Sequence, residues 1–96
     1  MSTILVVEDG KTDMQVISSY LKQAGYSVMG ATSSEEAQEK ITENKPDLIF
    51  LDVILPGKSG FEICRELKDN PNTSTIPVVF CSTKNMRYVI TITKIN

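Results

Sequence analysis

The sequence predicts an α/β fold, a doubly wound parallel sheet with helices on both faces. Short apolar runs rich in β-branched residues alternate along the chain with segments whose apolar residues recur at helical spacing. The 96 residues, 41% of them hydrophobic and 23% charged, suit one domain with a single core. Strands that alternate with helices imply right-handed crossovers and parallel pairing.

The predicted elements alternate in type as far as residue 83. In order they are a strand over 4–7, a helix over 12–24, a strand over 26–31, a helix from its cap Ser33 to about residue 44, a strand over 47–52, a helix that starts at its cap Ser59 and stops before Asn70, and a strand over 76–81. The strand over 4–7 is apolar throughout, and the strand over 47–52 is apolar between Asp47 and Asp52, which is typical of strands buried on both faces.

Caps and turn residues mark the boundaries of these elements. Gly25 stands where a left-handed helix C-cap belongs, and Ser33 with Glu36 forms a capping box. The apolar faces of the first and third helices include Tyr20 and Phe61.

Composition and charge exclude several classes of function. Ten basic against twelve acidic residues give a net charge of -2 and a pI near 5.0, so we expect no binding to nucleic acid. The longest apolar run, about five residues, is far below the ~20 that a membrane span needs, and Met1-Ser2-Thr3 leads into a strand without a signal-peptide layout. We therefore expect a cytoplasmic protein without a membrane partner.

Cysteine and histidine usage narrows the chemistry further. Cys64 and Cys81 lie in apolar patterns without metal or redox spacing, and we interpret them as reduced core residues. The chain has no histidine, which removes Ser-His and Cys-His nucleophile pairs and phosphotransfer through a histidine of its own.

Polar residues follow three of the predicted strands at the same edge of the sheet. Glu8 and Asp9 follow the first strand, Asp52 ends the strand over 47–52, and Ser82 follows the strand over 76–81. Gathered carboxylates repel one another unless a hard divalent cation joins them, and Mg²⁺ is the natural choice. With that charge screened, a carboxylate oxygen of Asp52 can attack a phosphoryl group and hold it as a mixed anhydride.

Each of these residues also has an ordinary structural interpretation. An acid near a helix N-terminus is favoured by the dipole, an acid after a strand favours a turn, and a hydroxyl is common in loops. Their joint placement at the ends of three apolar strands favours a site.

Three stretches of the chain resemble the receiver domain of two-component response regulators, which has a flavodoxin-like fold. They are the acidic pair Glu8-Asp9, DVILPGKSG over 52–60 and IPVVFCS over 76–82. The resemblance implies that Asp52 is the phosphoacceptor and that Glu8, Asp9, Asp52 and the backbone carbonyl of Ile54 bind Mg²⁺. It also implies that Ser82 is the hydroxyl switch and that a lysine on the last strand pairs with the phosphoryl group. Lys94 is the candidate for that lysine, although Ile95 replaces the family's usual proline and a solvated lysine is the favoured interpretation.

The end of the chain departs from the family, which continues through a fourth helix, a fifth strand and a fifth helix. Residues 87–95 are rich in β-branched residues and predict a strand, but only 83–86 separate them from the preceding strand. A parallel neighbour needs a crossover of about a dozen residues. We expect either an antiparallel hairpin, which places Lys94 far from Asp52, or a strand exchanged between subunits. The chain then divides into a receiver core, 1–83, and an atypical segment, 84–96, with a homodimer through 83–96.

Two functions from different classes follow from the sequence. The first is a receiver that accepts a phosphoryl group on Asp52 from a partner sensor histidine kinase, with Mg²⁺, and signals to a downstream effector by conformational change. Its chemistry is self-phosphorylation and self-dephosphorylation rather than turnover. The alternative is a phosphorylation-impaired assembly or interaction module on a receiver core. A haloacid dehalogenase-type phosphatase is disfavoured because Ile54 stands where its second aspartate belongs.

Overall fold

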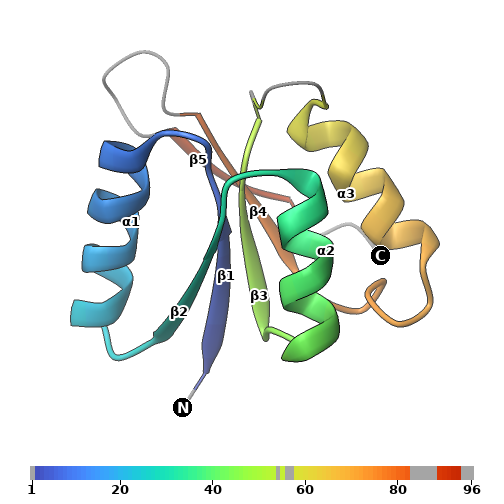
Figure 1. The fold of residues 1–96 in the computed structure, drawn as a ribbon, viewed down its shortest axis with the longest axis horizontal. Helices are drawn as coiled ribbons and strands as arrows, with labels where there is room; N and C mark the ends of the chain where they lie inside the picture. Colours follow the sequence, from blue (N-terminus) through green and yellow to red (C-terminus); the bar gives the residue numbers. More distant parts are fainter. Residues whose placement is uncertain (1, 54, 56–57, 83–88, 94–96) are drawn as a thin grey trace.

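A computed structural model describes residues 2–53, 55, 58–82 and 89–93. Five strands form one sheet in the order β2-β1-β3-β4-β5, in which the first four are parallel and β5 is antiparallel to β4 (Figure 1). The elements are β1 (Thr3–Val7), α1 (Lys11–Gln23), β2 (Ser27–Ala31), α2 (Ser34–Glu43), β3 (Leu48–Asp52), α3 (Gly60–Asp69), β4 (Val78–Ser82) and β5 (Val89–Thr93).

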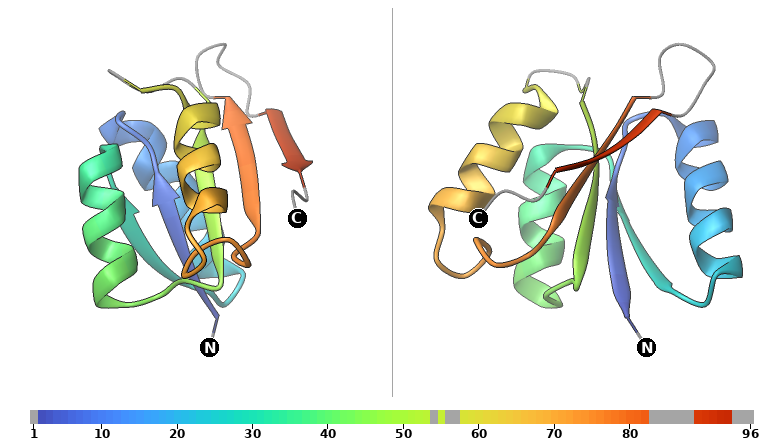
Figure 2. Two further views of the ribbon diagram at one scale, coloured as in Figure 1. Left: turned by 90° about the vertical axis from the view of Figure 1, so that its right-hand side faces the viewer. Right: turned by 180° about the vertical axis from the view of Figure 1, so that it is seen from behind.

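Helices cover both faces of the sheet, as the sequence predicts. In Figures 1 and 2, α1 lies on one face, and α2 and α3 lie side by side on the other. This arrangement follows from the connections, since each helix joins two parallel strands by a crossover. The predicted doubly wound parallel sheet is confirmed for these elements.

The apolar strands bury side chains on both faces of the sheet. Alternate residues of β1 belong to different clusters: Leu5 and Val7 pack on the α2 and α3 face, and Ile4 and Val6 pack on the α1 face. All four are at most 5% exposed. Full burial of such a side chain contributes roughly 1.5–3 kcal/mol, so β1 and β3 form the centre of the fold.

The predicted helix caps are present. The hydroxyl of Ser33 accepts a hydrogen bond from the Glu36 amide at 3.2 Å, and Ser59 caps α3 in the same way through the Glu62 amide at 3.2 Å. The Glu36 carboxylate accepts from the amide of Thr32, one residue before the cap, at 2.6 Å. Gly25 follows the end of α1 with a φ of 97°, which is the left-handed conformation that favours glycine.

Two aromatic residues lie differently from their prediction. Tyr20 on α1 is 66% exposed and Phe61 on α3 is 59% exposed, whereas helical spacing places both on inner faces. Because α1 packs on the sheet through Met14, Ile17 and Leu21, Tyr20 is left on its flank. Phe61 lies in the first turn of α3 and contacts the Phe80 ring, with the ring centroids 5.0 Å apart.

The last strand takes the antiparallel arrangement, one of the two alternatives that the sequence leaves open. Ser82 pairs with Val89 and Val78 pairs with Thr93, so β5 runs back along β4 and forms one edge of the sheet. Lys94 and the segment 83–88 lie outside the described residues.

The α1 face of the sheet carries a depression beside the helix. Its volume is about 360 Å³, and apolar side chains of β1, β3, β4 and α1 form most of its lining. They are Ile4, Leu21, Leu48, Phe50 and Val79, together with the half-exposed Tyr26. We call this feature the apolar depression.

Within the described ranges, no helix is both long enough and apolar enough to cross a membrane.

Candidate functional site

The candidate site lies where two central strands end. β1 stops at Val7, and Glu8 and Asp9 follow directly, while β3 ends on Asp52 itself. Val7 pairs with Leu51 in parallel register, so the two strand ends lie side by side at the carboxyl edge of the sheet. This edge is where doubly wound sheets place their ligands.

Three carboxylates gather at this edge. One oxygen each from Glu8, Asp9 and Asp52 lies within 4.8 Å of the others. Glu8 and Asp52 are completely buried, and Asp9 is partly buried. The predicted convergence of these side chains is therefore present in the structure.

Backbone contacts fix the position of Glu8. Its amide donates to the carbonyl of Ala31 at 2.9 Å, and its carboxylate accepts from the Gly10 amide at 2.9 Å. The pKa of Glu8 is raised from 4.5 to about 8, chiefly by burial and next by hydrogen bonding with Asp52, while the hydrogen bond from the Gly10 amide acts in the opposite direction. In the absence of a cation, the cluster therefore holds a proton at neutral pH.

A divalent cation fits this arrangement chemically. Carboxylate oxygens are the ligands that Mg²⁺ prefers, and a bound cation offsets both the cost of burying the charged form of Glu8 and its repulsion by Asp52. Glu8, Asp9 and Asp52 are the described residues that could hold it. Their burial beside one another supports a built site, because exposed acids do not carry this desolvation cost.

Of the other predicted site residues, Ser82 is described by its backbone, and Ile54 and Lys94 are not described. The backbone of Ser82 ends β4, one residue beyond Cys81, which pairs with Asp52, and the Ser82 side chain is outside the description. Ile54 and Lys94 lie outside the described residues altogether. The described β5 ends at Thr93 opposite Val78, at the other end of β4 from Cys81.

Sequence reasoning missed two glycines that border the acidic cluster. A methyl group on Gly10 would lie 3.2 Å from a carboxylate oxygen of Asp13 and 3.4 Å from one of Glu8, so a small residue suits this turn. Gly60 packs directly against the backbone of Asp52. The signal for both glycines is their place between a strand-end acid and the first turn of a helix.

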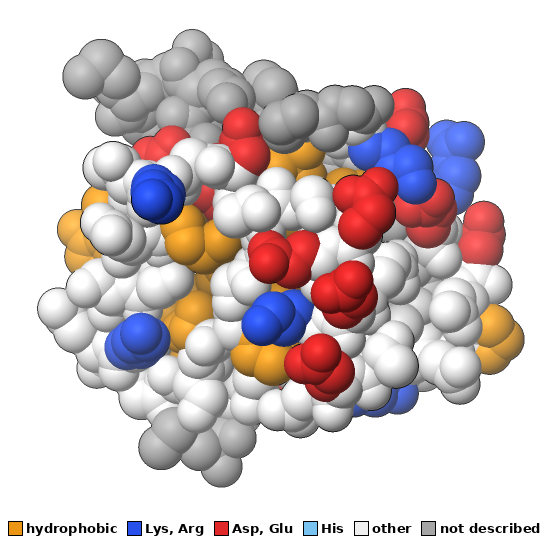
Figure 3. All heavy atoms as spheres, in the orientation of Figure 1, with side chains coloured by type: hydrophobic (Ala, Val, Ile, Leu, Met, Phe, Trp, Pro, Cys, Tyr) orange, Lys and Arg blue, Asp and Glu red, His pale blue; other side chains and the backbone are white. Residues whose placement is uncertain are grey.

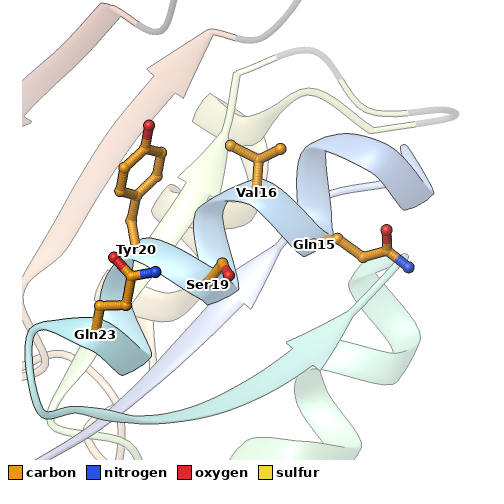
Figure 4. A pocket seen from close by; sticks show the side chains of 5 residues that line it. All are labelled: Gln15, Val16, Ser19, Tyr20 and Gln23. Atoms are coloured by element: carbon orange, nitrogen blue, oxygen red, sulfur yellow. The ribbon is translucent and has the colours of Figure 1, made fainter.

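Other surface features lie away from the acidic cluster. A depression of about 410 Å³ on α1 is lined by Gln15, Val16, Ser19, Tyr20 and Gln23, which Figure 4 shows projecting from the helix. In Figure 3, acidic side chains gather over α2, where Glu35, Glu36, Glu39 and Glu43 lie. These acids stand on one helix and do not include the three that converge from different strands.

Comparison with known proteins decides the family. The sequence model of the response regulator receiver domain matches residues 4–96. The chain belongs to the response regulator receiver domain family. This receiver domain is 33% identical to protein PilH of Pseudomonas aeruginosa over 85 residues, which cover 88% of this chain and 70% of PilH.

Solved structures agree with the receiver assignment. The N-terminal domain of a response regulator receiver protein from Methanoculleus marisnigri JR1 is similar with a TM-score of 0.80 and 35% identity, over 83% of this chain and 65% of that one. The Mn²⁺-bound form of response regulator Rcp1 is similar with a TM-score of 0.77 and 31% identity, over 88% of this chain and 68% of that one. The receiver domain described here thus spans about two thirds of each of these two chains.

Proposed function

We propose that this receiver domain accepts a phosphoryl group on Asp52 from a partner sensor histidine kinase, in a reaction that depends on Mg²⁺. The changed surface then binds a downstream effector. The observation that carries the proposal is the cluster of Glu8, Asp9 and Asp52, three carboxylates from two strand ends within 4.8 Å. Membership of the receiver family supports the same assignment.

The chemistry assigns the nucleophile to Asp52. One of its carboxylate oxygens attacks the phosphorus of the donor, so that a new oxygen–phosphorus bond forms while the bond from phosphorus to the donor's imidazole nitrogen breaks and that nitrogen keeps the electron pair. Hydrolysis of the resulting mixed anhydride returns Asp52 and releases phosphate. Complete burial of Asp52 beside Glu8 limits access to a donor that reaches the carboxyl edge of the sheet.

Mg²⁺ would be held by Glu8, Asp9 and Asp52, and when bound it supplies positive charge that offsets the charge of the incoming phosphoryl group. The similarity to Rcp1, which was solved in a Mn²⁺-bound form, supports the binding of a divalent cation by this domain. We assign the backbone carbonyl of Ile54 as a further ligand of the metal. The Ser82 hydroxyl would donate a hydrogen bond to the phosphoryl oxygens. Lys94 would pair with the phosphoryl group if it reaches Asp52.

A small acyl phosphate tests this proposal without the unknown kinase. Incubation with the phosphodonor and Mg²⁺, followed by intact-mass measurement, is expected to add the mass of one phosphoryl group. Addition of a chelator is expected to prevent that gain. Absence of any added phosphate on the wild-type chain would overturn the phosphoacceptor function and favour the alternative, an assembly module on a receiver core.

We further propose that the chain divides into a receiver core, 1–83, and an oligomerisation segment, 84–96. β5 is an edge strand of the described sheet and consists of Val-Ile-Thr-Ile-Thr. Edge strands with this composition pair readily with another chain. The apolar depression on the α1 face provides further surface for a second copy to cover.

A homodimer is the expected state at micromolar concentration. Size-exclusion chromatography with light scattering is expected to give twice the 10.6 kDa chain mass, and dilution is expected to shift the population toward the monomer. Thr91→Lys with Thr93→Lys places charges on the edge strand and is expected to weaken the dimer about tenfold or more. A wild-type chain that stays monomeric at micromolar concentration would contradict this assignment.

A further inference from the structure

The first turn of α3 packs directly against the backbone of the proposed phosphoacceptor. Gly60, the first residue of α3, is buried, and its amide donates to the carbonyl of Val53 at 2.8 Å. The beginning of α3 therefore lies against the end of β3, where Asp52 stands (Figure 1).

Only a residue without a side chain fits at position 60. A methyl group there would overlap the carbonyl oxygen of Asp52, and it would lie 2.9 Å from the Cα of Val53 and 3.0 Å from the carbonyl carbon of Asp52. These neighbours are backbone atoms, which cannot move aside by a change of rotamer. At Gly30, by contrast, the same methyl group would meet only the flexible side chain of Met14.

Two further contacts hold the same turn in place. The hydroxyl of Ser59 accepts from the amide of Glu62 at 3.2 Å, which caps the helix. The ring of Phe61 packs on that of Phe80 in β4, with the centroids 5.0 Å apart. The turn is thus anchored on β3 through Gly60 and on β4 through Phe61.

We propose that Gly60 is a positioning residue for Asp52: its missing side chain lets α3 pack on the Asp52 peptide and so directs the Asp52 carboxylate toward Glu8 and Asp9. This inference deepens the phosphoacceptor function and rests on it. A side chain at position 60 would push the first turn of α3 and the peptide of Asp52 apart. The Asp52 carboxylate would move with that peptide. Cation binding is sensitive to such displacement, because the three carboxylate oxygens must converge on one point.

The test compares Gly60→Ala with two matched variants. Gly30→Ala makes the same chemical change where the new methyl group meets only the Met14 side chain. Leu67→Ala removes a buried side chain two turns further along α3 and destabilises the helix packing away from Asp52. All variants are measured below their melting temperatures, with NMR spectra to confirm folding.

Mg²⁺ titration followed by NMR is the first measurement, and the rate of phosphoryl addition from an acyl phosphate is the second. Gly60→Ala is expected to weaken Mg²⁺ binding about tenfold or more and to slow phosphorylation at saturating Mg²⁺. Both control variants are expected to stay within about twofold of wild type in Mg²⁺ affinity, although Leu67→Ala melts at a lower temperature.

Each outcome decides one of the two proposals. If wild type binds Mg²⁺ and takes up phosphate but folded Gly60→Ala matches it, the positioning role is wrong and the phosphoacceptor function stands. If wild type does neither, the phosphoacceptor function fails and the positioning role fails with it. If Gly60→Ala does not fold, Ser59→Ala loosens the same turn, and unchanged Mg²⁺ affinity in that variant overturns the positioning role.

Discussion

Asp52→Asn is expected to abolish the gain of one phosphoryl mass from an acyl phosphate, with a fall in rate of at least about 100-fold. An amide has no anionic oxygen to attack phosphorus, and it removes one of the three carboxylates that would hold Mg²⁺. A second effect follows in the metal-free protein. Because the hydrogen bond and charge of Asp52 both raise the pKa of Glu8, that pKa is expected to fall in the variant. Intact mass and NMR titration of Glu8 measure the two effects.

Asp47→Asn is the matched control for Asp52→Asn. Asp47 immediately precedes β3, at the opposite end of the strand, where it is exposed and accepts a hydrogen bond from the Thr3 amide at 2.7 Å. Its asparagine variant keeps an acceptor oxygen, and we expect phosphorylation at the wild-type rate. Phosphate addition that survives Asp52→Asn would place the modification on another residue.

The metal-free protein is expected to lose stability as pH rises from 4.5 to about 8, because Glu8 is ionised in the unfolded chain before it is ionised in the folded chain. Below 4.5 the group is protonated in both the folded and the unfolded chain. Between 4.5 and about 8, the unfolded chain releases this proton while the folded chain keeps it, so the free energy of unfolding falls by up to about 1.4 kcal/mol per pH unit. Above about 8 both states are ionised and the Glu8 contribution is fully lost.

Urea denaturation in the presence of a chelator, repeated across this pH range, measures the effect. Glu8→Gln keeps the shape and the acceptor oxygen but removes the titration, so its stability is expected to depend less on pH than that of wild type. The difference between the two chains across the range amounts to several kcal/mol. Glu43→Gln, on the exposed end of α2, is the control and is expected to follow the wild-type curve. Parallel curves for wild type and Glu8→Gln would show that Glu8 is not the group responsible.

Most of the receiver core could be predicted from local sequence signals. The apolar run that precedes Glu8 and the one that ends at Asp52 can be buried only in the middle of a sheet, and Ser33 and Ser59 begin their helices through predicted caps. β4 begins at Val78, not at Ile76, although the carbonyl of Pro77 still accepts from the Ile49 amide at 3.0 Å. Element type follows from periodicity, whereas a boundary depends on the neighbouring strand.

The acidic cluster could be predicted from the topology of the sheet, whereas the packing of α3 around it could not. Parallel strands bring their carboxyl ends to one edge, so Glu8 and Asp52 had to converge once the topology was known. The requirement for glycine at position 60 arises from the docking of α3 on the backbone of Asp52, which no local pattern encodes. The exposure of Phe61 likewise depends on how α3 packs on the sheet. Helical spacing shows which residues share a face of the helix, but not how far that face is buried.

The reversed direction of the last strand also bears on the order in which the sheet assembles. Ser82 and Val89 are seven positions apart, while Val7 and Leu51 are 44 positions apart. Loop closure is less costly in entropy for the shorter separation, and local contacts speed folding. The pairing of β4 with β5 can therefore form first, before the long-range pairing of β1 with β3.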